Sequence, residues 1–357
     1  MNIREIRQKE YEDKFMNSGL VGILLLSVRM GKTRVALNIL LNFINKGATK
    51  ILVAFPENNI SKAWNDEIVT IGFPAIPIEF VNFRSLHKLE GNIYDVVIFD
   101  ECHELSDAQI ESVKKIRANM ATLALTGTLN LKNKRRLKNK LKWPVIAEYS
   151  FEQAIDDGII ADYKINVHIT PLDNKQLIQY KKKKKTEKQQ CDAYSFIINK
   201  LEEEGKDSKF MRLFRMRLIQ KSLAKIKKSR AILSENKGER ILVFCGLKEV
   251  ADSLGIPSEY SGKESGEIAK FADGEGDSLA VVNMASMGVT FKPLDRVVIN
   301  FTSSNAEDLQ QRIARAANLD FVGKIANIDI VCSSEKFEKE WIFKALKPFN
   351  TNKILFL

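Results

Sequence analysis

The stretch Leu26-Ser27-Val28-Arg29-Met30-Gly31-Lys32-Thr33 separates an apolar run, residues 21–26, from a helix-like pattern at residues 35–44. A strand, a turn ending in Gly-Lys-Thr and a helix form a phosphate-binding loop. N–H groups at a helix start attract anions, glycine allows their close approach, lysine adds a full charge, and the threonine hydroxyl can bind Mg²⁺. The stretch therefore predicts a nucleotide site. Leu26 stands where the usual motif has its first glycine, and a simple turn with a capping threonine is the alternative.

Short apolar runs alternate with helical patterns on both sides of this stretch. Buried strands are predicted at residues 22–26, 51–55, 95–99 and 122–125, and helices at residues 34–46, 59–69 and 106–119. Strands are predicted again at residues 241–244, 279–283, 297–301 and 325–331. Such alternation favours parallel sheets with helices on both faces. We predict an α/β protein with one domain at residues 1–165 and another at residues 239–357, joined by a basic, mainly helical connector or insertion at residues 166–238.

The charge of the chain favours a polyanionic partner. Its 357 residues include 56 Lys and Arg against 45 Asp and Glu, which gives a net charge of +11. Basic residues gather at residues 132–142, 181–185 and 206–230. Solvated surfaces also carry such clusters, so charge alone does not assign a ligand. Aromatic residues do not interleave with the lysines as a base-stacking platform requires, which favours duplex or branched DNA over reading of sequence.

Several classes of protein are excluded by composition. Four cysteines without a C-x-x-C pair and three scattered histidines indicate neither a zinc site nor a disulfide framework. No apolar run is long enough to span a bilayer, and the charged N-terminal residues do not resemble a secretory signal. We therefore expect a soluble protein without a membrane partner, located in the cytoplasm of a bacterium or phage-infected host.

A second motif supplies the chemistry that a phosphate loop needs. The apolar residues 96–99 are followed by Asp100-Glu101-Cys102-His103. At the C-terminal end of a buried strand, Asp100 can bind the Mg²⁺ that bridges phosphates, and Glu101 can accept a proton from the attacking water. A strand that simply ends in polar residues is the alternative, but it leaves the upstream loop unexplained. Together the two motifs predict a bound nucleotide and Mg²⁺.

These two motifs resemble motifs I and II of superfamily 2 helicases and translocases. Further segments are similar to the later motifs, in the family's order: Ile51–Pro56 with Trp64 and Glu67 to motif Ia in its SNF2-like form, Val81–Leu86 to Ib, Leu125-Thr126-Gly127-Thr128 to III, Ile241–Phe244 to IV, Tyr260–Lys263 to a segment that often follows IV, Asn283–Thr290 to V, and Gln311-Arg312-Ile313-Ala314-Arg315 to the start of VI. Tyr149–Ile160 also resembles the end of the first motor domain in restriction-enzyme motors and phage branched-DNA helicases.

The resemblance implies two RecA-like domains with ATP between them. Lys32 would bind the β- and γ-phosphates, Thr33 and Asp100 the metal, and Glu101 would activate water. Gln8 is a candidate adenine reader, and His103 and Gln311 would couple the nucleotide to domain closure. The remaining candidates are Arg29, Met30, Gly31, Arg34, Gly288 and Arg312 for the nucleotide, Thr126 and Thr128 for coupling, and Pro56, Arg84, Ser85, Ser261 and Gly262 for nucleic acid, with DNA favoured over RNA.

Motif VI departs from the family pattern at its second arginine, where this chain has Asn318. Arg315 matches the first arginine and is the predicted trans-acting residue in catalysis, with Arg312, about one helical turn earlier, as its substitute. An arginine finger contributes several powers of ten to phosphoryl transfer. Two alternatives to a helicase or translocase therefore stay open: an ATP-gated nucleic-acid clamp with weak hydrolysis, and a motor subunit that works with partner proteins in a larger restriction or remodelling complex.

Overall fold

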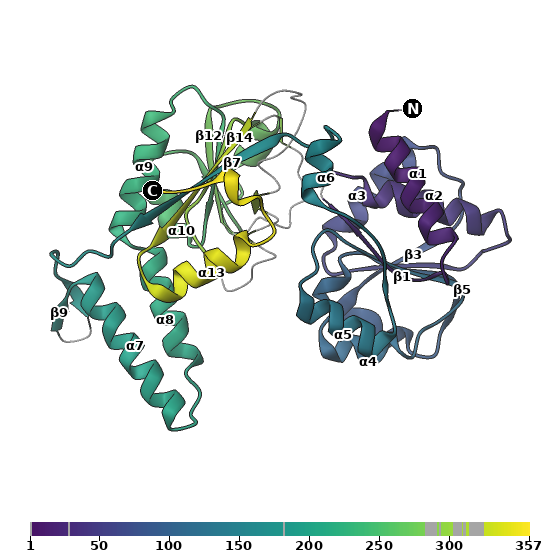
Figure 1. The fold of residues 1–357 in the computed structure, drawn as a ribbon, viewed down its shortest axis with the longest axis horizontal. Helices are drawn as coiled ribbons and strands as arrows, with labels where there is room; N and C mark the ends of the chain where they lie inside the picture. The colour runs from purple at the N-terminus through teal and green to yellow at the C-terminus, as the bar shows by residue number, and fades with distance from the viewer. Residues whose placement is uncertain are drawn as a thin grey trace. The chain divides into compact units, whose positions relative to one another are not determined.

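The computed structural model describes residues 2–27, 29–180, 183–282, 291–292, 294–302, 309, 312–313 and 325–357. These residues form two compact units, the first up to Ile160 and the second from Ala161 onward (Figure 1). Each unit is built on its own parallel sheet. The predicted α/β fold with two parallel sheets is therefore confirmed.

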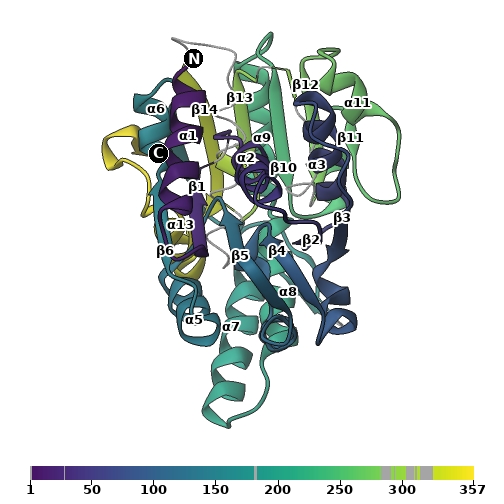
Figure 2. The same cartoon turned by 90° about the vertical axis from the view of Figure 1, so that its right-hand side faces the viewer.

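The first unit has a six-stranded parallel sheet. Its strands are β1 (Val21–Leu26), β2 (Ile51–Phe55), β3 (Ile78–Asn82), β4 (Ile93–Phe99), β5 (Arg117–Thr126) and β6 (Val145–Tyr149), in the order β3-β2-β4-β5-β1-β6. Figure 2 shows β2, β4, β5 and β1 side by side. All five residues of β2 and the last five of β1 are buried, which explains why both read as continuous apolar runs.

Helices cover both faces of this sheet (Figure 1). They are α1 (Ile3–Met16), α2 (Lys32–Ile44), α3 (Asn59–Thr70), α4 (Asp107–Val113), α5 (Leu131–Leu141) and α6 (Phe151–Asp156), with 3₁₀ turns η1 (Phe83–Leu89) and η2 (Cys102–Glu104). Ile110 of α4 and Leu137 of α5 join the core on one face. Asn2, Ser106 and Ser150 begin α1, α4 and α6 with capping boxes, which satisfy N–H groups that a helix start leaves free.

The predicted helix at residues 106–119 is wrong in its second half. Helix α4 ends at Val113, and β5 already begins at Arg117. The first residues of β5 alternate between exposed and half-buried, and only its later residues are mostly buried. An apolar run therefore marks the inner end of this strand but not its outer end, which the sequence pattern missed.

The second unit has a seven-stranded parallel sheet. Its strands are β7 (Asp162–Thr170), β10 (Ile241–Cys245), β11 (Ser258–Glu259), β12 (Ser278–Val282), β13 (Arg296–Ile299), β14 (Ile325–Ser333) and β15 (Ile354–Phe356), in the order β11-β12-β10-β13-β14-β7-β15. Strand β7 pairs with β14 along its whole length, from Asp162 opposite Ile325 to Thr170 opposite Ser333. The predicted domain limit at residue 165 falls inside this strand.

The segment between β7 and β10 is mainly helical, with a short hairpin of β8 (Ile178–Tyr180) and β9 (Lys183–Lys185). Helices α7 (Glu187–Glu203) and α8 (Lys209–Gln220) lie side by side (Figure 1), joined by the Arg212–Glu202 ion pair. Helix α9 (Leu223–Glu235) packs on β7 and β14 and contributes Ile232 to the core. Helices α10 (Lys248–Ser253), α11 (Glu267–Ala272) and α13 (Lys336–Leu346) and turn η4 (Thr351–Lys353) complete the described part of this unit. No helix among the described residues could cross a membrane.

Candidate nucleotide and nucleic-acid sites

The predicted phosphate loop connects β1 to α2 in the first unit. Gly31 is the N-cap of α2 and has a left-handed backbone with φ of 81°. A Cβ atom there would lie 2.4 Å from Nε2 of Gln8, so only glycine leaves room for that side chain. Nε2 of Gln8 donates a 2.9 Å hydrogen bond to the carbonyl oxygen of Met30. The structure therefore brings Gln8 of α1 directly onto the loop.

Neighbouring contacts fix α1 and the loop. Arg7 donates two hydrogen bonds to the carboxylate of Asp157, at 2.7 and 2.9 Å. Met30 is fully buried, and Thr33 lies in the first turn of α2. Arg34 forms an ion pair with Glu67 of α3. Arg29, like Glu101, has a positive φ, a backbone conformation that non-glycine residues rarely adopt and that often occurs at functional sites.

Lys32 and Glu101 meet at the carboxyl ends of β1 and β4. The Lys32 ammonium lies 2.7 Å from Oε1 of Glu101, and the two side chains stay 17% and 23% exposed. A Cβ atom at Gly127 would lie 3.0 Å from the Lys32 ammonium, so a larger residue at position 127 would crowd the lysine. Motifs I, II and III, predicted from separate stretches of sequence, therefore converge on one point.

Asp100 is held by a residue to which the sequence analysis gave no role. Nε1 of the fully buried Trp64 donates a 2.9 Å hydrogen bond to Oδ2 of Asp100. The backbone N–H of Glu101 donates to the other carboxylate oxygen, also at 2.9 Å. A buried indole N–H usually finds a partner, so the tryptophan in the second turn of α3, within the motif Ia resemblance, was the available signal. Trp64 fixes the carboxylate that is the candidate metal ligand.

His103 joins motif II to motif III. Its Nδ1 lies 2.8 Å from Oγ1 of Thr126, whose hydroxyl donates a 2.7 Å hydrogen bond to the carbonyl of Thr128. Since the single hydroxyl proton is used for Thr128, Nδ1 of His103 must be the donor to Thr126. Nε2 of His103 lies 3.2 Å from Glu104. The three predicted coupling residues, His103, Thr126 and Thr128, therefore form one chain of hydrogen bonds.

The charges of this cluster shift one another's pKa. Burial and the adjacent charge of Glu101 raise the pKa of Asp100. Burial would also raise the pKa of Glu101, but Lys32 and His103 outweigh it and lower that pKa. Burial opposes the charge on Lys32, yet Glu101 and Asp100 raise its pKa. His103 is likewise buried, and its hydrogen bonds to Glu101 and Glu104 raise its pKa to about 9. Perturbed groups that gather in this way are typical of functional sites.

The donor set fits Mg²⁺ bound together with phosphates. Mg²⁺ prefers oxygen ligands and usually binds one or two carboxylates, waters and substrate phosphates rather than an all-protein cage. Asp100 offers a buried carboxylate whose pKa is raised by burial and by the charge of Glu101, and Thr33 offers a hydroxyl at the start of α2. Among the described residues, no group of three or more His, Cys, Asp or Glu side chains could hold a metal alone.

The side chain of Asn82 links Pro56 and Arg84, two residues that are predicted to contact nucleic acid. Nδ2 of Asn82 donates a 2.9 Å hydrogen bond to the carbonyl oxygen of Pro56, and Oδ1 of Asn82 accepts one of 2.9 Å from the backbone N–H of Arg84. The Arg84 side chain is exposed and Ser85 is half-buried. Asn82 thus joins the loops after β2 and β3, and the sequence analysis quoted it within motif Ib without giving it this role.

The other predicted residues belong to the second unit. Ser261 and Gly262 form a tight turn closed by a 2.8 Å hydrogen bond from Lys263 N–H to the Tyr260 carbonyl, and Lys248 donates to the Ser261 carbonyl. Arg312 is buried, with its guanidinium 4.2 Å from the ring centre of Phe301 and 5.4 Å from that of Phe244. Gly288, Gln311, Arg315 and Asn318 lie outside the described residues.

Helix α8 carries two exposed aromatic side chains among its basic residues. Phe210 and Phe214 are 69% and 42% exposed, and they alternate along α8 with Lys209, Arg212 and Arg217. Phe214 also packs on Tyr194 of α7, with ring centres 6.2 Å apart. A sequence pattern alone could not show that both phenylalanines face solvent.

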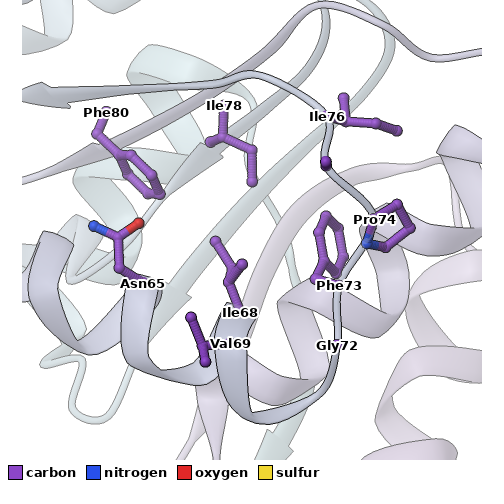
Figure 3. Close-up of a pocket in the computed structure, with 10 residues that line it drawn as sticks. Asn65, Ile68, Val69, Gly72, Phe73, Pro74, Ile76, Ile78 and Phe80 are labelled. Carbon is purple, nitrogen blue, oxygen red and sulfur yellow. The ribbon is translucent and has the colours of Figure 1, made fainter.

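A hollow of about 560 Å³ lies elsewhere in the first unit (Figure 3). It is lined mainly by apolar side chains from α3, the loop after it and β3, including Ile68, Phe73 and Phe80. None of the predicted nucleotide or nucleic-acid residues lines it. The hollow is therefore not the candidate ATP site.

Comparison with known proteins gives matches in both units. A family model described as the Helicase conserved C-terminal domain matches residues 224–320, and one described as Type III restriction enzyme, res subunit, matches residues 79–131. The DNA 3′–5′ translocase XPB2 of Sulfurisphaera tokodaii is 25% identical, with 87% of this chain and 78% of that protein covered.

Solved helicase structures share the fold. The Pyrococcus furiosus Hef helicase domain has a TM-score of 0.55 and 14% identity, and it covers 97% of this chain and 98% of its own. The S. cerevisiae Dbp5 structure bound to RNA and ADP BeF3 has a TM-score of 0.64 and 11% identity, with 98% and 88% covered. Both sheets are therefore of the RecA-like type. Together with the family matches and the translocase relative, this places the chain among the superfamily 2 helicases, a class of nucleic-acid-dependent ATPases.

Proposed function

We propose that this protein is an ATP-driven motor that moves on duplex or branched DNA. The observation that supports this most is the cluster of Lys32, Glu101, His103 and Thr126, because it joins the phosphate-binding lysine to the motif II acid and to the motif III coupling residue. In the proposal, Lys32 binds the β- and γ-phosphates, and Thr33 and Asp100 hold Mg²⁺. The metal supplies charge neutralisation of the phosphates.

Lys32 would exchange its partner Glu101 for a phosphate of ATP, and this exchange would activate Glu101 as a general base. ATP phosphates would compete with Glu101 for the Lys32 ammonium, which lies 2.7 Å from the carboxylate. Loss of Lys32 as a partner raises the pKa of Glu101, because Lys32 is among the charges that lower it. A carboxylate with a higher pKa is a better acceptor for the proton of the attacking water. Nucleotide binding would in this way prepare its own general base.

The second unit would complete the catalytic site. We propose that Gln311 and Arg315 reach the nucleotide when the two units close around it, as the resemblance to motif VI implies. Closure would bring positive charge to the transferring phosphoryl group, where it stabilises the transition state. The two units would bind the nucleic acid alternately, one more tightly after ATP binding and the other after product release. This alternation would move the protein along the nucleic acid.

Three features support branched or duplex DNA as the substrate. The translocase relative acts on DNA by its name, and the loops held by Asn82 offer backbone contacts, which carry no sequence information. The exposed Phe210 and Phe214 on the basic helix α8 could stack on unpaired bases at a branch point. Stacking of this kind tolerates any base.

The direct test is ATP turnover with and without nucleic acid. We expect faster turnover with forked or four-way DNA than with single strands or RNA at one fixed salt concentration, and loss of turnover in Lys32→Ala. Lys46→Ala, an exposed lysine just beyond the end of α2, is the matched control. Equal turnover with and without every nucleic acid would contradict the proposal.

One sequence feature favours an ATP-gated clamp as a second candidate. Asn318 stands where the family has its second motif VI arginine. A clamp would bind DNA tightly in the presence of ATP while hydrolysing very little of it. A strong rise in turnover on Asn318→Arg would favour the clamp, whereas an unchanged rate with robust wild-type turnover would exclude it.

The match of residues 79–131 to a restriction-enzyme subunit keeps open a place in a larger complex. We propose partner proteins only on this ground. Affinity purification from the native cell followed by mass spectrometry tests it, and recovery of the chain alone would count against it.

A further inference from the structure

Helix α5 carries cations on two faces with different surroundings. On one face Arg136 and Lys140 lie 3.6 and 3.0 Å from Oδ1 of Asp107, the first residue of α4. This face packs α5 against its neighbour. The other face holds Lys134, Arg135 and Lys138, and Lys142 follows as the C-cap of the helix. Lys132, in the first turn, is exposed and its charge acts on Asp107.

This second face, the free basic face, has no partner in the described part of the chain. The side chains of Lys134, Arg135, Lys138 and Lys142 form no ion pair there, and α5 contains no acidic residue. Arg135, Lys138 and Lys142 are exposed, and Lys134 is half-buried. Lys134 and Lys138 are four residues apart, and Arg135 and Lys138 three apart, spacings at which like charges destabilise a helix. A polyanion bound on this face would relieve that repulsion.

We infer that the free basic face of α5 binds the phosphate backbone of nucleic acid, a contact that rests on the proposed function. Lys134 and Lys142 are separated by about 12 Å along the helix axis, at 1.5 Å per residue. That length spans about three or four phosphates of one DNA strand. The face presents lysine and arginine cations, which bind phosphate oxygens. We expect the contact to be electrostatic and independent of sequence, because phosphate contacts carry no sequence information.

Hydrogen bonds connect helix α5 to the candidate ATP site, so nucleic acid bound to α5 would affect ATP hydrolysis. Asn130, its N-cap, follows Thr128 of motif III by two residues. Nη2 of Arg136 donates hydrogen bonds to the carbonyl oxygens of Leu105 at 2.7 Å and His103 at 3.4 Å. Helix α5, which would bind the phosphates of nucleic acid, is thus hydrogen-bonded to the backbone that carries motif II. Arg136 acts as a positioning residue between the two.

The test replaces the four cations of the free basic face by glutamine: Lys134→Gln, Arg135→Gln, Lys138→Gln and Lys142→Gln together. The matched control makes the same change in net charge on α13 of the second unit, with Lys336, Lys339, Lys344 and Lys347 all changed to glutamine. Fluorescence anisotropy then gives the affinity for a labelled duplex of about 20 base pairs over a series of salt concentrations. Circular dichroism checks that both variants are folded.

We expect the slope of log affinity against log salt to decrease in magnitude by about 3 to 4 in the α5 variant, since each lost phosphate contact removes about one. Affinity at low salt should fall at least about tenfold. The α13 control should keep the slope of the wild type. Equal slopes and affinities in the two variants would overturn the inference, and so would equally tight binding of poly-glutamate to the wild type, which would show a face for acidic proteins.

The same proteins separate this inference from the proposed function. If wild-type turnover does not respond to DNA, the proposed function fails whatever α5 does. If the wild type responds and the α5 variant needs no more DNA than the α13 control for half-maximal stimulation, only the assignment of α5 fails. We expect the α5 variant to need at least about tenfold more DNA, in line with its lost phosphate contacts.

Discussion

Among the described residues, each unit contains a lysine–glutamate pair away from the open surface, and the two pairs have the same length. Lys32 and Glu101 in the first unit are 2.7 Å apart, as are Lys225 and Glu338 in the second. Their surroundings differ. The first pair is 17% and 23% exposed, whereas the second is 0% and 2% exposed.

The partners of the two carboxylates differ as well. Glu338 also accepts hydrogen bonds from the Thr302 hydroxyl and the Ser333 N–H, so its remaining acceptor sites are filled from inside the unit. Glu101 has His103 beside it and lies on a left-handed backbone at the end of β4. A closed, fully satisfied pair contributes to structure, while an open pair on loops can exchange its lysine for an incoming anion. The same two residue types thus support the fold in one unit, and we propose that they serve catalysis in the other.

The largest effect that separates the pairs is expected from Lys32→Met. Turnover of ATP with DNA should fall at least about 100-fold, because one preorganised charge at the transferring phosphate is lost. The free energy of unfolding should change by less than about 1 kcal/mol, as for other accessible ion pairs. A coupled ATPase assay and urea unfolding measure the two effects. Retention of a tenth of the turnover would show that this pair is not catalytic.

The same substitution in the closed pair should act on stability. Lys225→Met leaves Glu338 buried without its cation and should lower the free energy of unfolding by about 3–5 kcal/mol. Urea unfolding followed by hydrogen exchange in α9 and α13 reports on the second unit alone. Lys227→Met, an exposed position on the same helix, should change stability by less than about 0.5 kcal/mol. If both variants are equally stable, the closed pair does not support the fold.

The stability of the first unit should also depend on pH, because His103 lies beside the open pair of Lys32 and Glu101. Its folded pKa of about 9 lies above the unfolded value of about 6.5, so the folded state binds the proton more tightly. The resulting stabilisation, up to about 3 kcal/mol, is complete below pH 6.5 and is lost as the pH rises through 9. His103→Gln should lack this loss. Urea unfolding across the range, with NMR titration of the imidazole, measures it, and parallel curves for both proteins would refute it.

The smallest effect is expected from Trp64→Phe, which removes the hydrogen bond to Asp100. Loss of a hydrogen bond to a buried charged group should cost about 2 kcal/mol of stability. The Mg²⁺ concentration for half-maximal turnover should rise several-fold, since Asp100 loses a partner that lowers its pKa. Trp143→Phe is the matched control, because Trp143 is buried in the same unit and packs on Phe99. Equal Mg²⁺ requirements in both variants would show that Trp64 has no part in metal binding.

The sequence predicted those parts of the fold where burial is continuous. Strands β1, β2 and β10 are buried over nearly all their residues, so their composition alone reveals them. Strand β3 is only half-buried, with the pattern Ile-Glu-Phe-Val-Asn, and it was not predicted. Strand β3 lies at the edge of its sheet, where a strand has no composition that separates it clearly from other segments. Strand β5 is central, but its first residues alternate between exposed and half-buried and carry no apolar run, so a helix was predicted there.

In the candidate site, motif order predicted which residues meet but not what holds them. Lys32, Glu101, His103 and Thr126 were expected in one place and are found there. The supporting contacts of Trp64, Asn82 and Arg136 cross between elements far apart in the chain, at separations of 36, 26 and 31 residues. Such contacts depend on packing geometry, which a single sequence does not contain. The predictions for Gly288, Gln311 and Arg315 stay predictions.

Strand β7 has a consequence for how the protein is made. Its His168 bonds to Asp329 of β14, a residue 161 positions later. On the ribosome the first unit can fold as soon as its own residues emerge, since domains generally fold as units from the N-terminus. Strand β7 emerges directly after it and must wait, with an apolar edge unpaired, until the whole helical segment and the strands up to β14 have been synthesised. Slow pairing of distant strands exposes a chain to aggregation. We therefore expect the second unit to fold last and to be the part of this protein most prone to aggregation during synthesis.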